Sequence, residues 1–575
     1  MTRPAFYRQL FPLTSLLVLA LAVLPHPARA QETDPQSRRV DSIMATFQGT
    51  NSPGAVVAVV RKGEIVFQRA YGMANLTHGV PFTVDTRTNI GSTSKQFTAF
   101  AVAFLARDGR LSLDDDVRSH IPELPDLGET VTLRHLISHT SGYREFLNAL
   151  AMGGWRMEDA DHIHRREIVE VVQRQPALQN SPGAEWNYNN TGYALLAMVV
   201  ERVTGESFPD WMADHVFGPV GMKDTAVRAH PGQIVPHSAQ GYVPAGEGAF
   251  REASDIGAAM GAGGIYTTVG DLARWMRNLG TGEVGGREIM EQMTTPYILT
   301  TGDTTSYGFG LMMDRERGLR RVQHGGADAA HRSHFAYYPE LDGGLVVLTN
   351  HGGAGGAINA RITEVFFGEE MEPREGGVEV EGLFPPDAAP FDPSAFDPAS
   401  FDVFVGRYEL EIQPGFVLSF RREGERLITQ ATGQPAFELT PTSDSTFALS
   451  VVEASITFHR DAEGVVTGLT LHQNGHHGAR RLPDVEEQPT DFSGLAARYY
   501  SPEFETFYTA VVEDGALVLR HRRRDPVTLS HASGDRFNGA FPFLEVVFER
   551  DGSGKVRGFR ASNGRARDVF FERMR

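Results

Sequence analysis

The 575-residue chain contains no cysteine, and only four of its 54 basic residues are lysines. The absence of cysteine excludes disulfide bonds, thiol nucleophiles, Cys-ligated zinc and iron–sulfur clusters. The formal charge of −18 makes nucleic acid and anionic membrane surfaces poor partners. With 41% apolar and 22% charged residues the composition is that of a folded protein, and the length predicts two or three domains.

The only long apolar run, Leu10 to Leu24, lies in the first 30 residues and is short for a membrane span. Arg3 and Arg8 precede it, and Ala28-Arg29-Ala30 follows as a small-x-small cleavage site. We therefore expect residues 1–30 to be a signal peptide cleaved near Gln31, with an N-terminal membrane anchor as the alternative. The segment holds three arginines and no acid, so cleavage takes the charge from −18 to −21. The mature protein is expected to be periplasmic or extracellular and free of the membrane.

The rest of the chain divides by pattern into a first domain and a linker. Residues 31–369 have strand-like runs at both ends and a helical middle, which predicts an α+β fold. In this fold an antiparallel sheet is flanked by helices and carries a helical subdomain. Residues 370–402 are acidic and proline-rich, with a repeated Phe-Asp-Pro unit, and are predicted to be an extended linker.

Beyond the linker the sequence repeats itself with an offset near 90 residues. Gly406-Arg-Tyr408 returns as Ala497-Arg-Tyr499, and Phe458-His-Arg-Asp461 returns as Phe548-Glu-Arg-Asp551. Each copy consists of short alternating strands separated by Gly, Asp and Asn turns. Residues 403–485 and 491–575 are therefore predicted to be two small all-β, barrel-like domains.

A serine and a lysine share one face at the start of a predicted helix. Ser92-Thr-Ser-Lys95 precedes an apolar pattern of helical period over 93–106, so the two side chains can meet. A serine hydroxyl needs an adjacent base to act as a nucleophile, and a buried lysine can serve. In a chain that uses arginine almost everywhere, a lysine here is informative, because arginine cannot give up its proton. The alternative is that Lys95 is a stray surface lysine.

Two further short motifs follow in order. Tyr188-Asn-Asn190 precedes an apolar helix, and His324-Gly325-Gly326 lies between two strand-like runs; His351-Gly-Gly353 has the same letters but is expected to be a strand-to-helix loop. No metal or other cofactor is expected. The groups His162/His164, His331/His334 and His472/His476/His477 lack the further ligands and the spacing of a zinc enzyme.

The ordered motifs S-x-x-K, Y-x-N and H-x-G resemble the class C β-lactamase and D,D-peptidase superfamily over residues 34–368. The resemblance includes Leu136-Ile-Ser-His-Thr-Ser-Gly142, and the two β domains look like those of CubicO-type peptidases and D-aminopeptidases. It implies that Ser92 is the acylated nucleophile and Lys95 its partner. It further implies that Tyr188 is the base that also protonates the leaving group and that Asn190 orients the substrate amide. Backbone N–H groups of Ser92 and Ala327 would form the oxyanion hole, with His324, Gly325 and Gly326 lining the substrate site.

One departure bears on the substrate. Typical β-lactamases and D,D-peptidases carry Lys-Thr-Gly or Lys-Ser-Gly at the third motif, where this chain has His324-Gly325-Gly326. A histidine is charged only part of the time near neutral pH, which disfavours recognition of a substrate carboxylate. The resemblance thus implies a hydrolase that forms an acyl-enzyme with a small peptide, amide or ester, and a cell-wall fragment is one candidate substrate. A D,D-carboxypeptidase or β-lactamase and a catalytically idle binding protein are the alternatives. The oligomeric state and the role of the β domains stay open.

Overall fold

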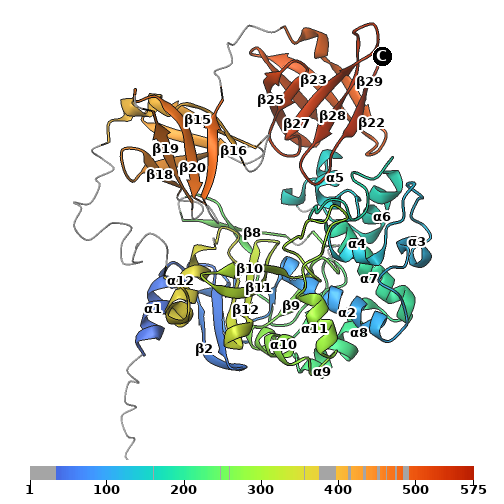
Figure 1. Ribbon diagram of the computed structural model, residues 1–575, viewed down its shortest axis with the longest axis vertical. Coiled ribbons are helices and arrows are strands. Elements are labelled where there is room, and N and C mark those ends of the chain that lie inside the picture. The colour runs from blue at the N-terminus through green and yellow to red at the C-terminus, as the bar shows by residue number, and fades with distance from the viewer. Residues whose placement is uncertain are drawn as a thin grey trace, which may run out of the picture.

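The computed structural model of the protein shows an α+β domain followed by two β-barrels (Figure 1). The described residues are 34–159, 161–246, 248–254, 256–257, 260–354, 356–373, 396–411, 416–431, 436–449, 454–461, 463–472, 476–482 and 491–575. The predicted signal peptide and most of the predicted linker lie outside them. Among the described residues, no helix combines the length and the apolar character needed to cross a membrane.

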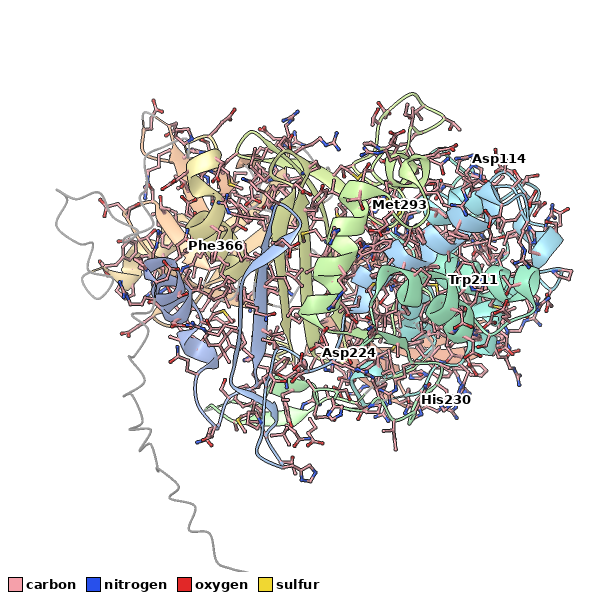
Figure 2. All side chains as sticks on the ribbon, turned by 90° about the horizontal axis from the view of Figure 1, so that it is seen from below. Asp114, Trp211, Asp224, His230, Met293 and Phe366 are labelled. Carbon is pink, nitrogen blue, oxygen red and sulfur yellow. The ribbon has the colours of Figure 1, made fainter. Side chains whose placement is uncertain are left out.

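A six-stranded antiparallel sheet forms the centre of the first domain, with the order β10-β11-β12-β13-β1-β2. Successive side chains of a strand point to opposite faces. Val57 and Val59 of β1 accordingly pack with the terminal helices α1 and α12, whereas Val56 and Ala58 pack with α10 on the other face. Figure 2 shows Phe366 of α12 and Met293 of α11 on opposite sides of the sheet. The elements named here are β1 Ala55–Arg61, β2 Glu64–Tyr71, β10 Met312–Glu316, β11 Leu319–Asp328, β12 His331–Tyr338, β13 Gly343–Thr349, α1 Pro35–Ile43, α10 Val269–Thr281, α11 Arg287–Met293 and α12 Ala357–Phe367.

The helical subdomain is built around α2 (Lys95–Arg107) and α7 (Asn190–Thr204), which pack against each other. Most residues of both helices are buried, as expected for helices inside a domain. The Asn189 side chain caps α7 by accepting from the Gly192 N–H group, and Gly205 ends it at φ +77°. The other helices of this region are α3 Val117–His120, α4 Leu133–Ile137, α5 Phe146–Met152, α6 Arg165–Arg174, α8 Phe208–Met212 and α9 Gly218–Val220.

Short strands and helical turns connect the larger elements. The small strands are β3 Met73–Asn75, β4 Val80–Pro81, β5 Thr88–Asn89, β6 Ala226–Val227, β7 Tyr242–Pro244, β8 Phe250–Glu252 and β9 Ile265–Thr267. Single turns of 3-10 helix occupy Ala45–Phe47, Gly91–Ser94, Met157–Asp159, Pro339–Leu341, Gly368–Glu370, Pro398–Val403 and Ser493–Leu495, and Ala213–Phe217 is a π-helical turn. The predicted α+β fold is confirmed.

Each predicted β domain is a closed, eight-stranded antiparallel barrel. The sequence repeat has a structural counterpart: the Tyr408 and Tyr499 hydroxyls each donate to the backbone carbonyl four residues earlier. The barrels comprise β14 Gly406–Leu410, β15 Val417–Glu423, β16 Arg426–Ala431, β17 Ala436–Pro441, β18 Thr446–Leu449, β19 Ala454–Arg460, β20 Val466–His472 and β21 His476–Arg481, then β22 Ala497–Ser501, β23 Thr506–Glu513, β24 Ala516–His521, β25 Arg524–Ser533, β26 Arg536–Asn538, β27 Glu545–Arg550, β28 Val556–Ser562 and β29 Val569–Arg573.

The end of the predicted linker belongs to the first barrel rather than to a spacer. Pro398–Val403 forms a 3-10 turn, and the Phe401 side chain is buried in the core of the barrel. Phe396 stacks on Phe401 at 5.1 Å between ring centroids. Two phenylalanines of the Phe-Asp-Pro cycle are therefore held by burial of apolar surface, which outweighs the extended preference of the neighbouring prolines.

The second barrel is docked on the helical subdomain above α5 (Figure 1). Phe146 and Leu150 of α5 and Ile168 of α6 belong to the same apolar core cluster as the interior of this barrel. Arg144 and Glu503 form an ion pair across the interface, with side chains only 4% and 7% exposed. Apolar burial and a desolvated ion pair together fix the position of the barrel relative to the first domain.

Candidate active site

Ser92 and Lys95 lie at the junction between the Gly91–Ser94 turn and α2. The α-helix begins at Lys95, so Ser92 precedes it on a 3-10 turn instead of opening the helix. The expected meeting of the two side chains occurs: Lys95 Nζ is 2.9 Å from Ser92 Oγ. Ser92 is half-buried and faces a cavity, whereas Lys95 is fully buried.

Two acceptors occupy the remaining hydrogen-bonding directions of Lys95. Its Nζ donates to Asn190 Oδ1 at 2.7 Å and to the Ala262 carbonyl at 2.8 Å. Burial holds the pKa of Lys95 well below its ordinary value, while the charge of Glu145 opposes this effect. A neutral amine has two N–H groups and one lone pair. With both N–H groups engaged, the lone pair is left for the Ser92 hydroxyl.

Asn190 is the first residue of α7 and is held at both ends of its amide. Its Oδ1 accepts from Lys95, and its Nδ2 donates to Glu145 Oε1 at 2.8 Å. The acceptor-only carboxylate fixes which way the amide points. Glu145 is fully buried and was missed by the sequence analysis, because 45 residues separate it from Asn190 without a local motif. In this arrangement Asn190 orients Lys95, and its contact with a substrate amide stays a prediction.

The Tyr188 hydroxyl is buried next to Ser92 and makes no hydrogen bond of ordinary geometry to the described residues. Burial raises the pKa of Tyr188, and the nearby Ser92 hydroxyl and Arg565 charge only partly oppose it. Lys95 Nζ lies over the Tyr188 ring at 4.8 Å from its centroid. The raised pKa favours the phenol form of Tyr188 at neutral pH, and its role as a base stays a prediction.

The His139 side chain packs against the Tyr188 ring. Its ring lies 4.3 Å from that of Tyr188, and its Nδ1 accepts from the Asn189 N–H group at 3.0 Å. The residue is 1% exposed, and burial holds its pKa well below the usual value. The neutral, hydrogen-bonded His139 imidazole thus fixes the position of the Tyr188 ring and of its hydroxyl.

The third motif lies inside β11 instead of between two strands, since β11 continues to Asp328. His324 is 3% exposed, and burial together with the positive charge of Lys95 lowers its pKa to about 3. Its Nδ1 lies 2.6 Å from the Gly325 carbonyl, which fixes the proton there, and its Nε2 accepts from the Tyr307 hydroxyl at 3.1 Å. A neutral, internally bonded histidine cannot supply the charge that lysine supplies in the related motif.

The glycines of this region let the Ser92 turn lie directly against β11. A Cβ atom on Gly326 would be 1.9 Å from the Ile90 carbonyl oxygen, and one on Gly91, at φ +48°, would be 2.6 Å from the Ala327 nitrogen. No side chain fits at either place. The two predicted oxyanion donors, the N–H groups of Ser92 and Ala327, therefore belong to segments in direct contact.

These residues surround one cavity of about 900 Å³. All the predicted site residues except the buried Lys95 line it: Ser92, Tyr188, Asn190, His324, Gly325, Gly326 and Ala327. Arg332 of β12 and Gly564 and Arg565 of the second barrel also line it, and the sequence analysis missed all three. His351 lies elsewhere, in the loop after β13, with its ring against Phe47 and Phe250. Within the described ranges no three His, Asp or Glu residues are grouped as a metal site.

Residues 40–365 match the protein family described as Beta-lactamase. The chain belongs to this family. Residues 392–492, which include the first barrel, match a family described as a domain of unknown function, DUF3471. These matches agree with the resemblance drawn from the three motifs.

Individual relatives are more distant. A D-aminopeptidase of Gluconobacter oxydans strain 621H is 28% identical over 60% of this chain and 64% of its own length. Penicillin-binding protein 4* of Bacillus subtilis strain 168 is 26% identical over 76% of this chain and 97% of its own. The octameric penicillin-binding protein homologue from Pyrococcus abyssi shares the fold, with a TM-score of 0.53 and 22% identity over 77% of this chain and 99% of that chain.

Proposed function

We propose that this Beta-lactamase family member is a serine hydrolase that cleaves a peptide, amide or ester through an acyl-enzyme on Ser92. The proposal rests on the position of Lys95 Nζ, 2.9 Å from Ser92 Oγ with its two N–H groups bound elsewhere. Burial favours the uncharged amine, which is the form that can accept the serine proton.

Acylation then follows from the placement of the protons. Ser92 Oγ attacks the carbonyl carbon and gives its proton to Lys95 Nζ, while the N–H groups of Ser92 and Ala327 stabilise the oxyanion. The bond to the leaving group breaks as the Tyr188 phenol donates its proton to the departing nitrogen or oxygen. Lys95 returns its proton to Tyr188, so that the serine proton has in net terms moved to the leaving group.

Hydrolysis of the acyl-enzyme uses the same groups in reverse order. A water molecule takes the place of the leaving group, gives one proton to the neutral Lys95–Tyr188 system and attacks the acyl carbon. Collapse of the intermediate releases the acid and returns the proton to Ser92 Oγ. This assignment differs from the role that the resemblance implied for Tyr188, because burial raises its pKa and lowers that of Lys95.

The relatives support an amide or peptide substrate. The matching proteins include D-aminopeptidases and a penicillin-binding protein. The match spans less than two thirds of the length of the Gluconobacter oxydans D-aminopeptidase. We further propose that the protein acts outside the cytoplasm, on the basis of the expected signal peptide in residues 1–30.

A fluorophosphonate probe tests the nucleophile. The mature protein should be labelled, Ser92→Ala should abolish the labelling, and mass spectrometry should place the adduct on Ser92. Labelling that persists in Ser92→Ala would assign the activity to another serine. A wild-type protein that is folded but unlabelled would instead support the idle binding protein.

A further inference from the structure

A turn of the second barrel forms part of the wall of the active-site cavity. The turn joins β28 to β29, and its residues Gly564 and Arg565 line the cavity together with Ser92 and Tyr188. The sequence left open whether the barrels cap the site or merely stabilise the protein. The position of this turn places one barrel at the reacting groups.

The turn is held in place by polar contacts with the first domain. The Glu145 N–H group donates to the Arg565 carbonyl at 3.2 Å, and the Asn187 amide donates to the Gly564 carbonyl at 3.3 Å. Further contacts are Gln179 Nε2 to the Arg565 carbonyl, Arg567 N–H to Gln179 Oε1, Asn563 Nδ2 to the Asn148 carbonyl, and the Arg567–Glu185 ion pair. Because these contacts already order the backbone of the turn, the turn loses little further conformational entropy when a ligand binds to it.

Arg565 presents its guanidinium group to the cavity. The group lies 4.9 Å from the centroid of the Tyr188 ring, and the side chain is exposed. Among the described residues, no carboxylate pairs with it. Burial is the main cause of the lowered pKa of Lys95, and the positive charge of Arg565 lowers it further. The guanidinium is thus an available positive charge at the reaction centre.

The other basic groups of the cavity are less suited to hold an anion. His324 is neutral and bonded internally, and burial lowers the pKa of His334 to about 4. Arg332 donates to the His331 carbonyl at 2.8 Å, and the negative charge of Asp328 acts on it. Of the two arginines that line the cavity, Arg565 is the one whose guanidinium makes no hydrogen bond to the described residues.

We propose that Arg565 binds a carboxylate carried by the leaving group of the substrate. The inference rests on the proposed acyl-enzyme function, since Tyr188 is the donor to the leaving group and Arg565 lies over the same ring. Arg565 is then a specificity-determining residue supplied by the barrel, and the substrate class is a peptide or ester with an anionic leaving group. It takes over the role that lysine has in the third motif of the penicillin-recognising relatives.

The expected effect is one charge-assisted interaction. A guanidinium binds a carboxylate through two parallel N–H···O bonds, and such contacts change affinity about 10- to 100-fold. Because Ser92 and Lys95 stay in place without Arg565, hydrolysis of an uncharged substrate should persist.

Two esters with the same acyl group give a direct test. The N-acetyl-D-alanyl esters of meta-hydroxybenzoic acid and of meta-hydroxybenzamide differ in the charge of the leaving group and scarcely in its shape. The kcat/KM ratio of the pair is measured on the pH plateau for the wild type, Arg565→Gln, Arg565→Lys and Arg332→Gln. Arg498→Gln is the matched control, because Arg498 is an exposed arginine of the same barrel that stacks on Phe507.

The wild type should prefer the carboxylate ester by about 10-fold or more. Arg565→Gln should bring the kcat/KM ratio close to one, because kcat/KM falls only for the anionic ester. Arg565→Lys should restore part of the wild-type preference, and Arg498→Gln should leave the ratio unchanged. A wild type without preference, an Arg565→Gln variant that keeps it, or an Arg332→Gln variant that alone removes it would overturn the proposal. Fluorophosphonate labelling of every variant separates these outcomes from failure of the proposed function, in which Ser92 itself would stay unlabelled.

Discussion

The Glu145 carboxylate should set the pH at which Lys95 becomes a base. The two are linked through the Asn190 amide, which donates to Glu145 and accepts from Lys95. A negative charge stabilises an ammonium ion, so Glu145 raises the pKa of Lys95 against the effect of burial. Glu145→Gln removes this charge and keeps an oxygen that accepts from Asn190. The pKa of Lys95 should therefore fall in the variant.

The hydrogen-bond distances set the size of the effect. With 2.8 Å from Glu145 to Asn190 and 2.7 Å from Asn190 to Lys95, the two charges are about 8 Å apart or less. At an effective dielectric constant of about 20, their interaction is about 2 kcal/mol. Lys95 must be neutral to accept the serine proton, so the acidic limb of kcat/KM should move to lower pH by about one unit.

The assay is the pH profile of kcat/KM for an uncharged ester, accompanied by the pH dependence of fluorophosphonate labelling. Glu185→Gln is the matched control, since Glu185 also lines the cavity but is exposed and paired with Arg567. Its acidic limb should move much less than that of Glu145→Gln. A limb that stays in place in Glu145→Gln, or moves to higher pH, would refute Lys95 as the base.

Three other substitutions test separate parts of the structure. Lys95→Arg keeps the charge but cannot accept a proton, so steady-state hydrolysis should fall by about 10² to 10⁴, and activity within tenfold of wild type would argue against the mechanism. Gly326→Ala places a Cβ 1.9 Å from a backbone oxygen and should lower the free energy of unfolding by about 1–3 kcal/mol or more, measured by thermal unfolding. In Gly325→Ala the new Cβ meets nothing closer than 3.7 Å, so this variant should lose little stability. Equal losses of stability in the two variants would contradict the close contact. Arg144→Met leaves the buried Glu503 carboxylate without its partner and should destabilise the protein by about 3–5 kcal/mol in denaturant unfolding. Adding Glu503→Gln should recover part of this loss. A single variant as stable as the wild type would contradict a desolvated ion pair.

Features with a strong local period were predictable from the sequence. The strand-like runs at both ends of residues 31–369 form the central sheet and the helical runs between them form the subdomain, because apolar positions recur there at strand and helical spacing. The sequence repeat predicted the two barrels because interior and exterior residues alternate along each barrel strand, which gives a regular apolar pattern. Boundaries were weaker: β11 runs through His324-Gly-Gly, where glycine gives no apolar signal of a strand.

Contacts between distant segments were not predictable. Glu145 and Arg565 carry no motif, and each reaches the site only through the packing of a helix or a barrel against its neighbour. The state of His324 was likewise hidden, because the sequence suggests a partly charged imidazole whereas burial beside Lys95 makes it neutral. Protonation depends on desolvation and nearby charges, which only the three-dimensional arrangement supplies.

The histidine of the third motif and the arginine of the barrel are best understood together. A neutral His324 spares the buried site beside Lys95 the desolvation cost of a permanent positive charge. Arg565 supplies a positive charge from the second barrel, where the side chain is exposed and its desolvation is small. The charge is then placed by docking of the barrel instead of by the sheet. Recognition of an anionic leaving group thereby depends on a domain interface, and the histidine that disfavoured carboxylate binding in the sequence no longer excludes it.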